Sequence, residues 1–273
     1  MAVKQTVSSR ANPLYKRLRA LVEKGAASDL CLLEGPRLVL EALAAGLTVV
    51  EAAAAPRAEA TAVGRAALTA LAAARVSVHH LKAELLASLS ETETSQGLLA
   101  LARRPTFQED LLFRGKPLLL VADAVQNPGN LGGLLRTAEA AHATGAYLTA
   151  GCADPLSWKA LRGAMGSAFR LPHVRALSME AVIDRLTERG VAVLATAADG
   201  DTRYDEADLR RPVAIVVGAE GAGLNPVTLA RAHGRLYVPL APPVESLNVG
   251  VAAALVLYEA ARQRGFAARA APR

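Results

Sequence analysis

The second half of the chain alternates short apolar runs with longer segments in which apolar residues recur at helical spacing. The short runs predict strands and the spaced segments predict helices. Such alternation predicts an α/β fold with a mostly parallel sheet covered by helices on both faces. The expected order is strand 118–124, helix 131–143, strand 146–150, helix 155–162, strand 168–172, helix 179–189, strands 191–196 and 213–217, helix 226–232, strand 236–240 and helix 247–263.

The first hundred residues predict a smaller α/β unit. A helix is expected from Pro13, with Leu14 and Leu18 on one face and basic residues on the other. The elements expected after it are strand 30–33, helix 36–45, strand 47–53, helix 59–74, strand 76–81, helix 83–89 and strand 97–102. The stretch up to Pro117 is polar and contains two prolines, which is typical of a linker. The sequence therefore predicts three parts: a first domain at 1–104, a linker at 105–117 and a second domain at 118–273.

Charge and composition narrow the class of protein. The chain of 273 residues has 31 Lys and Arg against 25 Asp and Glu, a formal net charge of +6. This balance favours a polyanionic partner such as a nucleic acid, although a solvated basic surface would give the same count. Two distant cysteines and five histidines without ligand spacing predict neither a disulfide nor a metal site. No apolar run is long enough for a membrane span, and the N-terminus lacks a signal-peptide core, so a cytoplasmic protein is expected.

Three loops rich in small residues each follow a predicted strand: 127–133, 218–223 and 238–248. Parallel strands end at one edge of a sheet, so a single composite ligand site is expected there. Asn130 and Ser246 are expected to cap the helices after the first and third loops, and Asn248 to bond to a neighbouring loop. The glycine spacing matches neither a dinucleotide fingerprint nor a Walker loop, which argues against a nicotinamide-dependent oxidoreductase. Arg136 is suited to a phosphate, or simply pairs with Glu139 or Glu220.

Together the loops resemble a known family. The stretches NPGNLGGLLRTAEA (127–140), VVGAEGAGL (216–224) and VPLAPPVESLNVGVAAA (238–254) are similar, in order and spacing, to the three motifs of the SpoU/TrmH-type RNA 2′-O-ribose methyltransferases of the SPOUT superfamily. The similarity covers residues 118–262, and Gly250 stands where the family often has Ser. The first domain resembles the L30e-like substrate-binding domain of many ribosomal-RNA members through Ser9-Arg10, Asn12-Pro13 and Glu34–Arg37.

The resemblance implies an enzyme that transfers a methyl group from S-adenosylmethionine to a ribose 2′-OH of RNA. It also implies a deep trefoil knot and a homodimer. The separate first domain favours ribosomal RNA, specifically 23S, over transfer RNA. A non-catalytic RNA-binding or ribosome-assembly protein of the same fold is the other alternative, although the family's polar site residues are all present.

The resemblance also assigns site residues. Gly218, Val238 and Leu247 should hold the methyl donor through backbone groups, with Thr196 and Leu240 nearby. The family's catalytic and site-shaping positions fall on Asn130, Arg136, Glu220, Ser246 and Asn248. A guanidinium stays protonated well above neutral pH, so Arg136 is expected to orient the target phosphate and stabilise oxyanion charge rather than act as a base.

Overall fold

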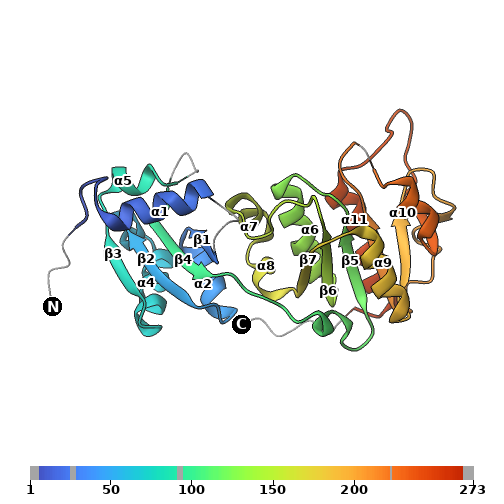
Figure 1. Cartoon of the computed structure of the whole chain (residues 1–273), viewed down its shortest axis with the longest axis horizontal. Coiled ribbons are helices and arrows are strands. Elements are labelled where there is room, and N and C mark those ends of the chain that lie inside the picture. The colour runs from blue at the N-terminus through green and yellow to red at the C-terminus, as the bar shows by residue number, and fades with distance from the viewer. Residues whose placement is uncertain (1–5, 25–28, 91–94, 222, 267–273) are drawn as a thin grey trace. The chain divides into compact units, whose positions relative to one another are not determined.

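The structure is a computed structural model that describes residues 6–24, 29–90, 95–221 and 223–266. Contacts between residues divide the chain into two compact units (Figure 1). Unit 1 comprises Met1–Thr106 together with Leu156–Phe169, and unit 2 comprises Phe107–Pro155 and Arg170–Arg273. Within the described part of the chain, no helix is long and apolar enough to cross a membrane.

Unit 1 contains a four-stranded mixed sheet in the order β1-β4-β2-β3. Strand β4 is antiparallel to both β1 and β2, whereas β2 and β3 are parallel. The smaller α/β unit that the sequence predicts is confirmed. Its elements are α1 (Pro13–Lys24), β1 (Leu30–Glu34), α2 (Pro36–Ala44), β2 (Val49–Ala54), α3 (Pro56–Ala60), α4 (Ala62–Ala73), β3 (Ser77–His80), α5 (Ala83–Ala87), β4 (Leu98–Arg103) and α7 (Trp158–Ala164).

Unit 2 contains a seven-stranded sheet in which every pairing is parallel, so the predicted parallel α/β fold is confirmed. The strand order is β7-β6-β5-β10-β8-β11-β9. Its strands are β5 (Leu118–Ala122), β6 (Gly145–Thr149), β7 (His173–Leu177), β8 (Ala192–Thr196), β9 (Thr202–Arg203), β10 (Val213–Val217) and β11 (Gly234–Tyr237). Its helices are η2 (Glu109–Phe113), α6 (Pro128–Ala140), α9 (Met179–Glu188), α10 (Pro226–Arg231) and α11 (Val249–Gln263). The short helix α8 (Ser167–Arg170) spans the boundary between the units, since Ser167–Phe169 belong to unit 1 and Arg170 belongs to unit 2.

The strands of unit 2 do not lie in the sheet in the order of the chain. Strand β10 inserts between β5 and β8, and β11 inserts between β8 and β9. Each late strand therefore pairs on both sides with strands that precede it in the sequence. The loops that follow β5, β10 and β11 consequently emerge within four neighbouring strands, at the carboxyl edge of the sheet.

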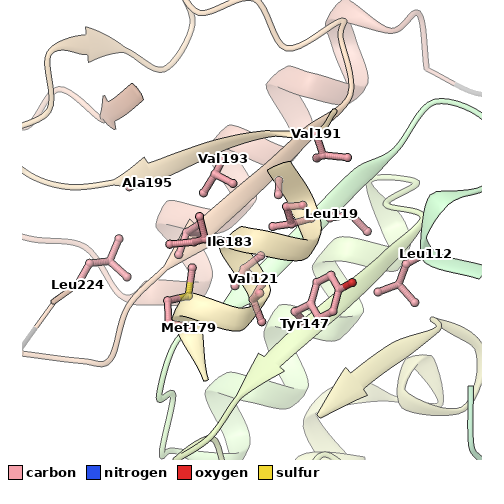
Figure 2. Close-up of a cluster of buried hydrophobic side chains, with 14 residues drawn as sticks. Leu112, Leu119, Val121, Tyr147, Met179, Ile183, Val191, Val193, Ala195 and Leu224 are labelled. Carbon is pink, nitrogen blue, oxygen red and sulfur yellow. The ribbon is translucent and has the colours of Figure 1, made fainter. Parts of the chain in front are cut away.

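One face of this sheet is closed by α9. Figure 2 shows Met179 and Ile183 of α9 among Val121, Val193 and Tyr147 of the strands. Leu112 of η2 belongs to the same cluster and is fully buried. The Tyr147 hydroxyl donates to Glu109 of η2, and burial raises the pKa of this phenol well above its ordinary value. Part of the predicted linker is therefore a helix that packs into the core of unit 2.

Two other predictions of secondary structure are wrong. The residues predicted as strand 168–172 end a short helix, and the strand begins at His173 instead. Gly166 precedes that helix with a φ of 88°, so the chain turns before it extends. The helix predicted at 59–74 is two helices, because Thr61 is extended and its hydroxyl accepts from the Gly64 amide to start α4.

Arg264, at the end of α11, bonds to the backbone that precedes strands β5 and β10. Its guanidinium donates to four carbonyl oxygens, at 2.6–3.0 Å. These belong to Lys116, Pro117, Leu209 and Arg211, which lie before β5 and β10. Desolvation lowers the pKa of this guanidinium. Its partners are backbone oxygens, two of them in partly buried bonds, so substitution removes a charged donor from all four.

Replacing Arg264 with methionine is expected to lower the free energy of unfolding by about 2 kcal/mol or more, because hydrogen bonds from a charged donor each contribute about 1.5–3 kcal/mol. Urea denaturation would measure this change. Arg210→Met is the matched control, since that exposed side chain pairs with Asp208 at the surface and should contribute less than about 1 kcal/mol. Equal losses in the two variants would contradict the role assigned to Arg264.

Candidate functional site

Three loops meet at the carboxyl edge of the unit 2 sheet. The first follows β5 and leads into α6, the second follows β10, and the third joins β11 to α11. Strands β5 and β10 are neighbours in parallel register. Their loops therefore start side by side, and the third starts two strands away from β10, beyond β8.

Side-chain hydrogen bonds link the three loops in a chain. Asn248 Nδ2 donates to Asn130 Oδ1 at 3.4 Å, and Asn130 Nδ2 donates to Glu220 Oε1. The predicted bond from Asn248 to a neighbouring loop is therefore present. Residues from positions 130, 220 and 248 of the sequence thus form one polar cluster on the surface of unit 2.

The helix caps differ from those predicted. Asn127, not Asn130, caps α6, since its Oδ1 accepts from the amides of Gly129 and Asn130. Asn248, not Ser246, caps α11 through the Gly250 amide. Ser246 is exposed two residues before that cap. Because the caps lie elsewhere, the Asn130 side chain is available to join the other loops.

Arg136 lies on the exposed surface of α6, two turns beyond Asn130. Neither of its predicted partners pairs with it: Glu139 binds Arg170 through two hydrogen bonds, and Glu220 binds Asn130. Within the described residues no ion pair involves Arg136. Its guanidinium is therefore available for an anionic ligand.

A shallow groove of about 770 Å³ begins at the same cluster and continues along α6 and α11. Gly129, Asn130 and Asn248 line it at one end. Three large apolar side chains farther along are about half exposed, namely Val251 (49%), Tyr258 (44%) and Phe266 (52%). Val251 and Tyr258 belong to α11, and no sequence pattern distinguished them from the buried face of that helix.

Comparison with known protein families is decisive. Residues 117–258 match the family model described as the SpoU rRNA Methylase family, which covers more than half of the chain. Residues 12–100 match the MRM3-like substrate binding domain. The chain belongs to the SpoU rRNA methylase family. It is an RNA methyltransferase whose methyl donor is S-adenosylmethionine.

Individual relatives agree with the family. An uncharacterized tRNA/rRNA methyltransferase of Synechocystis sp. is 35% identical over 95% of this chain and 94% of the relative. The 23S rRNA (guanosine(2553)-2′-O)-methyltransferase RlmP of Bacillus subtilis is 39% identical over 67% of this chain and 72% of its own length. The solved AdoMet-bound rRNA methyltransferase of Sinorhizobium meliloti is 30% identical, with a TM-score of 0.79 over 94% of this chain and 97% of that one.

The residues expected to hold the donor in this SpoU methylase are apolar and partly covered. Val238, Leu240 and Leu247 are half-buried, and the Thr196 hydroxyl donates to the carbonyl oxygen of Val216. An adenosyl sulfonium requires apolar walls and backbone hydrogen bonds rather than a basic cradle. The side chains present fit that requirement.

Gly218 lies against the backbone of its own loop. A Cβ on this residue would lie 2.4 Å from both the carbonyl carbon and oxygen of Gly223. The second loop therefore folds back onto itself, with the Gly223 amide donating to the Ala219 carbonyl and the Gly223 backbone lying against Gly218. The space beside Gly218 belongs to the loop's own backbone.

Sequence reasoning missed the residues that fix the first loop of this SpoU methylase. Ala124 has a left-handed φ of 52°, and its amide donates to the hydroxyl of the buried Thr149. The same hydroxyl donates to Asp123 at 2.8 Å. Asn127 could have been found, because Asn followed by Pro is the favoured order at a helix start. The role of Thr149 has no sequence signal.

Proposed function

We propose that this protein methylates the 2′-oxygen of a ribose in ribosomal RNA, most specifically 23S RNA. The observation that carries the proposal is the cluster of Asn130, Glu220 and Asn248, beside helix α6, whose Arg136 pairs with no described residue. The names of the relatives from B. subtilis and S. meliloti, both rRNA methyltransferases, support the class of RNA. Transfer RNA is the alternative substrate, since the Synechocystis relative is named for both.

In this function the protein mainly holds the methyl donor and the ribose oxygen in the correct relative position. Methyl transfer is an in-line displacement, so the ribose oxygen must be held about 3 Å from the methyl carbon. Gly218, Val238 and Leu247 would hold the donor through backbone groups, with Thr196 and Leu240 beside it. Bound S-adenosylmethionine supplies an electrophilic methyl group. Arg136 binds the phosphate next to the target ribose and stabilises charge that develops on the oxygen.

The two parts of the chain divide the task. Residues 1–104 recognise RNA, and residues 118–273 carry the donor site and the chemistry. Residues 105–117 join them, and helix η2 within this segment packs into unit 2. The match of 12–100 to a substrate binding domain supports this division. Lys4 of the basic N-terminal segment lies outside the described residues. On the described part of that segment, Arg10 and Lys16 are exposed, and neither forms an ion pair with a described residue.

Replacing Arg10 and Lys16 together with glutamine is expected to weaken RNA binding and to reduce its salt dependence. Each lost phosphate contact lowers the slope of log affinity against log salt by about 1. Filter binding of unmodified 23S RNA over a range of salt concentrations would measure the slope. Replacing Arg210 and Arg211 together with glutamine is the matched control, because it removes the same two charges from exposed positions of unit 2. An unchanged slope in the double variant would show that Arg10 and Lys16 do not contact the RNA phosphates.

The active form is a homodimer in the cytoplasm. The groove along α6 and α11 supports this, since Val251, Tyr258 and Phe266 form an exposed apolar patch that starts at the site. Replacing Tyr258 with glutamate is expected to give monomers in sedimentation velocity experiments, because it places a charge in a surface that becomes dry on association. A dimer of unchanged stability would show that another face is used.

The sheet order also supports a trefoil knot. Two late strands insert between strands that precede them in the chain, an order that a threaded chain can have. Such threading is rare among protein folds.

Mapping of 2′-O-methyl groups tests the function itself. RNA from a strain without this protein should lack one ribose methylation in 23S RNA, and the purified protein with S-adenosylmethionine should restore it. A full set of methylations in the deletion strain would refute the assignment. Loss at a transfer-RNA position would select the alternative substrate.

A further inference from the structure

The hydrogen bonds of the site leave few groups able to take a proton from the ribose hydroxyl. Asn248 uses its Oδ1 to cap α11 and its Nδ2 to bind Asn130. Asn130 accepts that bond and donates its own amide to Glu220. Amide nitrogens are not basic, and Arg136 carries donors only. These three residues hold and orient, and the proton must go elsewhere.

Three carboxylates lie in or beside the three loops. Asp123 precedes the first loop and accepts a hydrogen bond from the Thr149 hydroxyl. Glu245 is exposed in the third loop and makes no hydrogen bond to another loop within the described residues. Glu220 alone is tied to α6, the helix that bears Arg136.

Glu220 also has the spare capacity that the step requires. Its Oε1 accepts from Asn130, whereas no bond to Oε2 is found among the described residues. An ionised carboxylate accepts at both oxygens. The bond from Asn130 fixes the direction of the carboxylate, so Oε2 is presented by a restrained group rather than a freely rotating one.

We infer that Glu220 is the general base of the reaction, an inference that rests on the proposed function. The ribose O–H bond breaks and its proton passes to Glu220 Oε2. The oxygen forms the new O–CH₃ bond as the S–CH₃ bond breaks, and that electron pair remains on sulfur. Glu220 is exposed and returns the proton to water. Asn130 is the positioning residue for this carboxylate.

The test compares Glu220→Gln with Glu245→Gln in single-turnover methylation of 23S RNA taken from the deletion strain. The glutamine at 220 keeps an oxygen for the Asn130 bond but cannot accept a proton. General-base catalysis contributes about 10²–10⁴-fold, so Glu220→Gln should lose at least about a hundredfold in rate. Glu245→Gln should keep the parental rate. Calorimetry should give similar affinity for S-adenosylmethionine in both variants and the parent.

The pH profile separates a base from a structural residue. A base acts only when deprotonated, so the parental rate should show an inflection and fall as pH is lowered. Glu220→Gln should lack that inflection, and its rate should rise with hydroxide instead. A Glu220→Gln variant with the parental rate, or a slow one that keeps the parental inflection, would overturn the inference. In either case the parent still methylates RNA, so failure here is distinct from failure of the proposed function.

Discussion

Replacing Arg136 with alanine is expected to reduce the rate of methyl transfer by a hundredfold or more, about the loss seen when one charged contact to a transition state is removed. The residue is exposed on α6 and unpaired among the described residues, so the substitution breaks no structural bond. Stability and affinity for S-adenosylmethionine should barely change. Single-turnover kinetics, urea denaturation and calorimetry would measure the three quantities.

Arg136→Lys is the matched variant, since it keeps the charge and loses the planar fork that binds two phosphate oxygens. Weak activity is expected, between that of the parent and that of the alanine variant. If Arg136 were the base, the lysine variant would show a new inflection at alkaline pH. No such inflection is expected, and turnover of Arg136→Ala at the parental rate would remove the residue from the mechanism.

Gly218→Ala is expected to abolish binding of S-adenosylmethionine and to destabilise unit 2. Its single added carbon would lie 2.4 Å from the Gly223 backbone, and backbone cannot move aside as a flexible side chain can. The second loop must therefore open, which displaces Glu220 from Asn130 as well. Overpacking of this kind costs about 1–3 kcal/mol in unfolding free energy. Calorimetry and urea denaturation would measure both losses.

Gly221→Asn provides the comparison within the same loop. A Cβ there meets no atom within 4 Å, and its φ of 81° lies in the left-handed region that Asn tolerates better than other residues. Stability close to that of the parent is expected. If Gly218→Ala were as stable as Gly221→Asn and bound the donor normally, the close approach to Gly223 would not be required.

The sequence predicted the parallel sheet of unit 2 because its central strands β5, β10 and β8 are buried on both faces and consist almost entirely of apolar residues. Val213–Val217 was predicted without error for this reason. The strand predicted at 168–172 was wrong because a buried helical turn such as Ser167–Phe169 is equally apolar. The sequence pattern also could not predict that η2 packs into the core of unit 2. Leu112 lies in a polar stretch, and nothing in the sequence distinguishes it from an exposed apolar residue.

The site was predictable only in part. Its three loops could be found from their glycines and from the strands before them. The bonds among Asn130, Glu220 and Asn248 depend on the strand order, which local sequence does not encode. The choice of Asn127 rather than Asn130 as the cap of α6 also decides which side-chain amide can bond to the other loops. Hydrophobic periodicity does not distinguish these two residues, although the Asn-Pro order at Asn127 does.

The insertion of β10 between β5 and β8 has a consequence for synthesis of the chain. When residues up to Thr196 have left the ribosome, the chain contains β5 and β8 but not yet β10, the strand that lies between them. Both then present unpaired backbone edges at what will become the centre of the sheet, and such edges promote aggregation. A chain terminated before Val213 would therefore keep β7, β6 and β5 of the sheet but leave β8 without either of its partner strands. Cellular quality control should remove such products far more readily than chains that lack only residues after Arg264.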